Sequence, residues 1–171
     1  LTEPYWFLGS DEYLRAIAQE VSIPVLRKDF VVDSYQIFEA KVAGASAVLL
    51  LCGVLDDEQL ADYIELCDDL GMSALVEAYD EEELRRAVAV GARVIGVNNR
   101  NLKDFTVDNG NSRRLREMIP RDVLFVSDSG VRDASDVQAA RAMGADAVLV
   151  GEALMRSADR AAKLAELRGR L

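Results

Sequence analysis

The sequence predicts an α/β protein in which repeated strand–helix units build a parallel sheet that closes as a β/α barrel. Three observations support this fold: short apolar runs recur at intervals of roughly 20 to 30 residues, helical segments lie between them, and polar residues follow most runs. Runs that are apolar throughout are typical of strands buried on both faces, as in a parallel sheet. We expect these strands at 25–26, 47–51, 74–76, 94–97, 123–126 and 147–150.

The segments between the strands carry helix signals. One helical face is marked by apolar residues at helical spacing: Leu60, Ile64 and Cys67. Another helix is expected to begin at Asp80, with Glu83 three residues later as in a capping box. Several helices should end at a glycine in the left-handed conformation, namely Gly44, Gly71, Gly91 and Gly144.

Polar residues at the C-terminal ends of nearly all strands favour a barrel over an open, doubly wound sheet. An open sheet would gather its site at one switch point, and no Gly-x-Gly-x-x-Gly or Walker-type loop follows any expected strand. With a helix near 11–20 and a strand stub before it, the chain carries one unit fewer than the eight of a barrel. We therefore expect residues 1–171 to form a single barrel domain that is incomplete at its N-terminus.

Composition excludes several classes of partner. The formal net charge is −10 at pH 7, which argues against nucleic acids and anionic membranes as partners, and the oligomeric state stays open. No apolar run approaches the roughly 20 residues of a membrane span and no signal-like segment opens the chain, so a cytoplasmic location is expected. Cys52 and Cys67 are too few for a disulfide framework and should be buried or semi-buried thiols.

The chain contains no histidine, which removes the commonest general base and the commonest metal ligand. Acid–base chemistry would have to use Lys, Glu, Asp or Tyr. A transition-metal site is not expected, because no histidine and only two separated cysteines are available.

Lys28 and Glu77 are the main candidates for chemistry. Lys28 is the lysine that lies at a strand end, where an ammonium could donate a proton or pair with a carboxylate of a substrate; it could also be a solvated cation. Glu77 follows the run 74–76, and a carboxylate there is costly unless it is paired or used. It could act as a general base or form a structural bridge to Lys28 two strands away.

The remaining strand ends offer amide and backbone donors. Asn98, Asn99 and Arg100 follow one strand, where an asparagine could orient a substrate hydroxyl or carbonyl or simply form a turn. The loops at 127–130 and 151–152 follow the last two strands, which in phosphate-binding barrels commonly form the anion site, although tight turns would use the same residues.

Taken in order, these motifs resemble indole-3-glycerol-phosphate synthase of tryptophan biosynthesis. The resemblance runs through Leu-Thr-Glu-Pro at 1–4, Leu-Arg-Lys-Asp-Phe at 26–30, Leu-Val-Glu at 75–77, Gly-Val-Asn-Asn-Arg-Asn-Leu at 96–102, Ser-Asp-Ser-Gly at 127–130 and Gly-Glu-Ala-Leu-Met at 151–155. It implies a (β/α)8 barrel and a carboxy-lyase reaction. That reaction closes the indole ring of 1-(2-carboxyphenylamino)-1-deoxyribulose 5-phosphate, with loss of carbon dioxide and water and without a cofactor.

The resemblance also implies roles for individual residues. Lys28 would be the general acid, Glu77 would remove or relay a proton, and Asn98 would orient the substrate. Further substrate contacts are implied at Phe7 and Phe30, on the anthranilate ring, and at Arg100, Leu102 and Asp128. The phosphate would be bound by Ser129, Gly130, Gly151 and Glu152, the last through its backbone N–H.

The chain departs from the family pattern at three places. Asp128 and Tyr79 stand where the family commonly has Glu and His. The family also has an N-terminal helical extension and a first strand with a Glu-x-Lys pair, neither of which is found here, so we expect a piece of a longer polypeptide. Two alternatives stay open: another sugar-phosphate barrel enzyme such as phosphoribosylanthranilate isomerase, and an inactive barrel fragment that folds by oligomerisation or complementation.

Overall fold

The computed structural model describes residues 1–101 and 104–169, and its centre is one sheet of six parallel strands. The strands lie side by side in the order of the sequence: β1 (Leu26–Arg27), β2 (Ala47–Leu51), β3 (Ser73–Ala78), β4 (Val94–Asn98), β5 (Leu124–Asp128) and β6 (Ala147–Leu149). Each apolar run predicted as a strand overlaps one of them. The predicted α/β class with a parallel sheet is therefore confirmed.

Helices alternate with the strands and follow the predicted signals. They are α1 (Asp11–Glu20), α2 (Tyr35–Val42), α3 (Asp57–Asp69), α4 (Glu81–Ala89), α5 (Asn111–Leu115) with the 3-10 turn η1 (Arg116–Met118), α6 (Ala134–Ala142), α7 (Glu152–Arg156) and α8 (Arg160–Leu167). The predicted left-handed glycines are found at helix ends, with positive φ at Gly44, Gly71, Gly91 and Gly144. Asp80 caps α4 by accepting from the N–H of Glu83, whereas the Glu83 carboxylate accepts from Tyr79.

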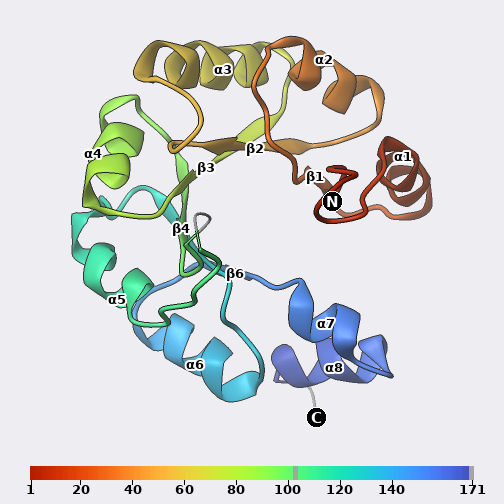
Figure 1. The fold of residues 1–171 in the computed structure, drawn as a ribbon, viewed down its shortest axis with the longest axis vertical. Helices are drawn as coiled ribbons and strands as arrows, with labels where there is room; N and C mark the ends of the chain where they lie inside the picture. Colours follow the sequence, from red (N-terminus) through yellow and green to blue (C-terminus); the bar gives the residue numbers. More distant parts are fainter. Residues whose placement is uncertain (102–103, 170–171) are drawn as a thin grey trace.

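The sheet is curved, with α2 to α6 arranged around its outer side (Figure 1). Alternate residues of each strand therefore face two different environments. Val48 and Leu50 belong to the large core between the sheet and the helices, whereas Leu49 and Leu51 belong to a smaller cluster on the inner face. The small inner cluster leaves room at the C-terminal strand ends for polar side chains.

Five of the six strands differ from the prediction by one or two residues at an end, and β2 matches it. β3 extends to Ala78 and β5 to Asp128, so Glu77 and Asp128 lie within strands rather than after them. The hydrogen-bond ladder continues past the apolar run, because Glu77 pairs with Gly96 and Asp128 with Asn98. β1 is only two residues long.

The expected strand stub before the first helix is not a strand among the described residues. Instead, the N–H of Thr2 donates to the carbonyl of Lys28 across 3.3 Å, just beyond β1. Within residues 1–101 and 104–169, no helix is both long and apolar enough to cross a membrane.

Candidate active site

Four polar side chains gather on the inner face of the sheet because of the two-residue period of the strands. Each lies two residues after a residue on that face: Lys28 after Leu26, Glu77 after Leu75, Asn98 after Gly96 and Asp128 after Val126. Glu77, Asn98 and Asp128 are buried, and Lys28 is partly buried. The structure thus brings together the three residues predicted to be catalytic, and adds Asp128 to them.

Lys28 lies between two buried carboxylates. Its Nζ is 3.6 Å from Oε2 of Glu77 and 3.3 Å from Oδ2 of Asp128. Burial by itself would lower the pKa of Lys28, but these carboxylates outweigh it and raise that pKa above its ordinary value. Lys28 is therefore held in its charged form. The bridge from Glu77 to Lys28 across two strands, which the sequence left open as an alternative to a general base, is present, and the additional pairing with Asp128 was not predicted.

The carboxyl group of Glu77 has a strongly perturbed pKa. Burial and, after it, the carboxylate of Asp128 raise its pKa to about 8, although Lys28 and Asn98 act in the opposite direction. Its Oε2 is a buried atom without a hydrogen bond among the described residues. A carboxyl group with a pKa near neutrality, and with an oxygen that accepts no hydrogen bond from the described residues although Lys28 lies 3.6 Å away, can exchange a proton with a bound molecule.

A buried polar network behind this cluster was missed in the sequence. The side chain of Asn111 donates to the carbonyls of Tyr79 (2.7 Å) and Asn98 (3.0 Å), and so ties the ends of β3 and β4 together. Asn99 donates to the Ser129 carbonyl at 3.0 Å. Asparagine in a loop normally indicates a turn, so the sequence around Asn111 contains no signal that separates a buried clamp from an exposed turn residue.

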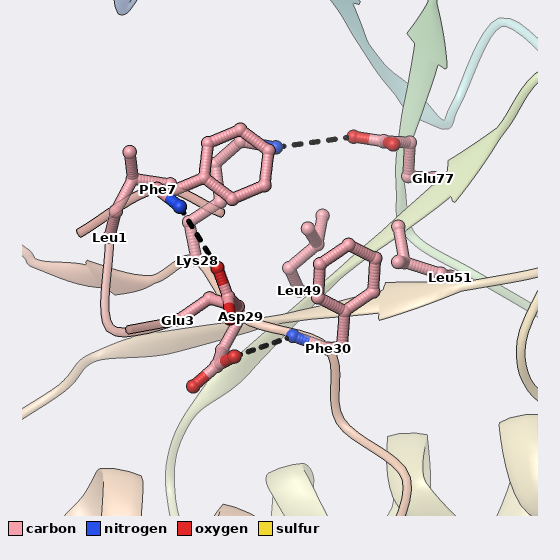
Figure 2. Close-up of a pocket in the computed structure, with 9 residues that line it drawn as sticks. All are labelled: Leu1, Glu3, Phe7, Lys28, Asp29, Phe30, Leu49, Leu51 and Glu77. Atoms are coloured by element: carbon pink, nitrogen blue, oxygen red, sulfur yellow. Dashed lines mark hydrogen bonds and ion pairs between the residues drawn. The ribbon is translucent and has the colours of Figure 1, made fainter. Parts of the chain in front are cut away.

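A pocket opens beside Lys28 and Glu77 and has a largely apolar lining. Figure 2 shows its lining residues, which are Leu1, Glu3, Phe7, Lys28, Asp29, Phe30, Leu49, Leu51 and Glu77. The rings of Phe7 and Phe30, both predicted as substrate contacts, come from two separate loops to this pocket. The N–H of Phe30 donates to the side chain of Asp29 at 2.8 Å, which fixes the backbone at this point. The pocket could hold a flat apolar group next to the charged cluster.

The residues predicted to bind phosphate lie at the ends of β5 and β6. Ser129 and Gly130 both have positive φ, and the Ser129 N–H donates to the carbonyl of Leu149, the last residue of β6. Gly151 precedes α7 and has open space where a Cβ atom would lie. A hydrogen bond therefore links the loops after β5 and β6. Their small residues leave the backbone N–H groups of both loops little covered by side chains.

Arg100 and Glu152 are joined by an ion pair of 3.0 Å between the end of β4 and the start of α7. Glu152 was predicted to act through its backbone N–H, and its side chain is occupied by Arg100 and Arg156. Leu102, another predicted contact, lies outside the described residues.

Neither cysteine contributes to the site. Burial raises the pKa of Cys52 to about 12 and that of Cys67 to about 11, and both are buried free thiols, as predicted. Among residues 1–101 and 104–169, no group of three His, Cys, Asp or Glu side chains is arranged to hold a metal ion.

Comparison with solved structures reveals the same fold in proteins of low sequence identity. The 3-hexulose-6-phosphate synthase from Salmonella typhimurium has a TM-score of 0.76 at 21% identity, over 99% of this chain and 84% of that one. The 3-keto-L-gulonate-6-phosphate decarboxylase from Vibrio cholerae has a TM-score of 0.74 at 13% identity, over 96% of this chain and 79% of that one.

Sequence comparisons are more specific. A family model described as indole-3-glycerol phosphate synthase matches residues 1–167. Proteins of that name from Ruminiclostridium cellulolyticum and Leuconostoc mesenteroides are 59% and 52% identical over 99% of this chain, and the aligned parts make up 65% and 64% of those proteins. The chain thus spans slightly less than two thirds of the length of these relatives. It belongs to the indole-3-glycerol phosphate synthase family.

Proposed function

We propose that the protein catalyses closure of the indole ring of 1-(2-carboxyphenylamino)-1-deoxyribulose 5-phosphate, a step of tryptophan biosynthesis. The reaction joins the aromatic ring to the ribulose chain and releases the ring carboxylate as carbon dioxide and one oxygen as water. The observation that carries the proposal is the cluster of Lys28, Glu77 and Asn98 beside an aromatic pocket, in a chain of this family.

In this proposal Lys28 is the general acid. Its raised pKa keeps the ammonium charged at neutral pH, so it can donate a proton to a substrate oxygen as negative charge develops there. Glu77 removes or relays a proton, since its pKa of about 8 lies close to neutrality. Asn98 orients the substrate and the Glu77 carboxylate, to which its amide donates at 2.7 Å.

The rest of the substrate would extend over the strand ends. Phe7 and Phe30 would contact the anthranilate ring, because both line the pocket beside Lys28. Arg100 and Asp128, together with Leu102, would contact the middle of the substrate. Ser129, Gly130, Gly151 and Glu152 would hold the phosphate through backbone N–H groups, which suits a chain whose bulk charge repels anions.

We further propose that in the intact enzyme the six strands are part of a closed eight-stranded barrel. The sequential parallel order of the six strands and the curvature of their sheet support this proposal (Figure 1). No cofactor is needed for the proposed reaction. A cytoplasmic location stays a prediction from the sequence.

The direct test follows product formation by the fluorescence of indole-3-glycerol phosphate, using the full-length protein. Lys28→Ala should abolish ring closure and leave the fold intact, because it removes the proton donor. Lys41→Ala is the matched control, since Lys41 is an exposed lysine in α2 and should not affect turnover. Near-wild-type turnover by Lys28→Ala would defeat the proposed role of Lys28, and isomerisation of phosphoribosylanthranilate without ring closure would defeat the proposed function.

A further inference from the structure

Residues 3–9 form a closed loop at the rim of the pocket. The N–H of Gly9 donates to the carbonyl of Glu3 at 2.7 Å, which closes the loop. The carboxylate of Glu3 lies inside it and accepts the backbone N–H groups of Tyr5 (2.8 Å), Trp6 (2.7 Å) and Phe7 (2.9 Å). Figure 2 shows the bond from Phe7 to Glu3, with the Phe7 ring directed to the pocket.

Both oxygens of Glu3 are used by the loop. Oε1 accepts from Tyr5, and Oε2 accepts from Trp6 and Phe7, while the residue as a whole is only 8% exposed. A carboxylate saturated by backbone donors is poorly suited to take a proton or bind a substrate group. Glu3 lines the pocket, but its contacts are directed to the chain that carries Phe7.

Apolar packing does not explain how the loop keeps its shape. Tyr5, Trp6 and Leu8 are 86%, 79% and 78% exposed, so the side chains at the tip contribute little burial. Leu8 also has a positive φ of 53°, a conformation that costs a non-glycine residue free energy. The hydrogen bonds to Glu3 are therefore the main interactions that offset this strain.

We propose that Glu3 is a positioning residue that holds loop 3–9 so that Phe7 faces the pocket and can bind the aromatic ring of the substrate. The inference rests on the proposed function for the identity of that ring. It assigns to Glu3 an effect on substrate binding, with no direct part in proton transfer.

Steady-state kinetics of the full-length protein test this assignment. Glu3→Gln keeps the shape of the side chain but replaces one acceptor oxygen with an amide donor that faces a backbone N–H. We expect KM to rise by about tenfold, with kcat changed by less than about threefold, because the loss of one charge-assisted bond is on this scale. Glu20→Gln, at the exposed end of α1, is the matched control and should change neither constant.

A double-mutant cycle tests whether Glu3 acts through Phe7. In a Phe7→Ala background the loop has no ring to present, so Glu3→Gln should raise KM by less than about twofold. An unchanged KM for Glu3→Gln alone, or an equal rise with and without the Phe7 ring, would overturn the inference. A fall in kcat at constant KM would also overturn it, because Glu3 would then serve the chemical step.

A fluorescence measurement separates this inference from the proposed function. Trp6 is the one tryptophan of the 171 residues, so its anisotropy reports loop motion once any tryptophan outside them is replaced by phenylalanine. Glu3→Gln should lower the anisotropy of Trp6, and Glu20→Gln should not. If the wild-type protein forms no indole product, the proposed function fails. If Glu3→Gln leaves the anisotropy of Trp6 unchanged, Glu3 does not hold the loop, and the inference fails whether or not indole product is formed.

Discussion

The side-chain amide of Asn98 donates to Oε1 of Glu77 across 2.7 Å, and so joins the ends of β4 and β3 on the inner face of the sheet. The orientation of this amide is fixed, because the N–H of Arg100 donates to its Oδ1 at 2.9 Å. Asn111 reinforces the arrangement through the main chain, where its side chain bonds the carbonyl of Asn98 and that of Tyr79. The direction of the Glu77 carboxylate is therefore set by an asparagine on the neighbouring strand.

Asn98→Ala should impair turnover more than folding. The substitution removes a hydrogen bond to a carboxylate, a contact that contributes about 1.5 to 3 kcal/mol, so kcat should fall at least about tenfold. Far-UV circular dichroism should be unchanged. A variant with wild-type kcat would show that the amide of Asn98 is not required to orient Glu77.

Activity should depend on pH through Glu77. Because burial raises its pKa to about 8, the carboxyl group is largely protonated below that pH, and a role in accepting a proton requires the carboxylate. We therefore expect kcat/KM to increase with pH up to about 8 and then level off. A pH–rate profile without a limb in this range would contradict the role.

Two variants shift this limb in opposite directions. Asp128 raises the pKa of Glu77, so Asp128→Asn should move the limb to lower pH. The amide of Asn98 lowers that pKa, so the residual activity of Asn98→Ala should show the limb at higher pH. Glu77→Gln should remove the limb altogether.

Arg27 should be essential for stability and not for chemistry. Its side chain is 5% exposed on the outer face of β1, where it pairs with Asp11 in α1 (3.3 Å) and Glu39 in α2 (3.5 Å) and donates to the Gln36 carbonyl (2.7 Å). Arg27→Met should lower the free energy of unfolding by roughly 3 kcal/mol in urea denaturation, because partly buried carboxylates lose their partner. The exposed Arg15→Met should stay within about 0.5 kcal/mol of wild type.

Much of the fold could be predicted from the sequence because its signals are local. An uninterrupted run such as 47–51 and a glycine such as Gly71 each report a strand or a helix end without reference to distant residues. The period of two residues along a strand also places Lys28 and Glu77 on one face, so that a bridge between them could be considered as an alternative from the sequence.

The features that could not be predicted from the sequence depend on contacts between distant segments. Asp128 pairs with Lys28 only because the sheet curves, and curvature is not encoded in any single strand. Asn111, the first residue of α5, and Glu3, in a loop, are polar residues whose sequence context predicts exposure, and only the folded chain reveals the backbone groups that they bind.

Gly151→Ala offers a test of phosphate binding that is independent of folding. Gly151 has φ −117° and ψ −63°, and, apart from its two chain neighbours, no described residue has an atom within 4 Å of the position that a Cβ would take, so alanine should be accommodated there. The melting temperature should therefore stay the same. If the backbone at 151–152 approaches the phosphate closely, the added methyl group should raise KM by about tenfold, equivalent to about 1.4 kcal/mol, and weaken inhibition by inorganic phosphate.

Gly130→Ala is the informative contrast to that variant. Gly130 has φ +81°, and a Cβ there would clash with Oδ1 of Asn109, so alanine would be strained even after that side chain moved away. We expect it to lower the free energy of unfolding by at least about 1 kcal/mol and to raise KM as well. Any rise in KM of Gly151→Ala can thus be assigned to weaker phosphate binding, because this variant should keep the stability of the wild type. A Gly151→Ala variant with wild-type KM and wild-type inhibition by phosphate would exclude the backbone at 151–152 from the phosphate site.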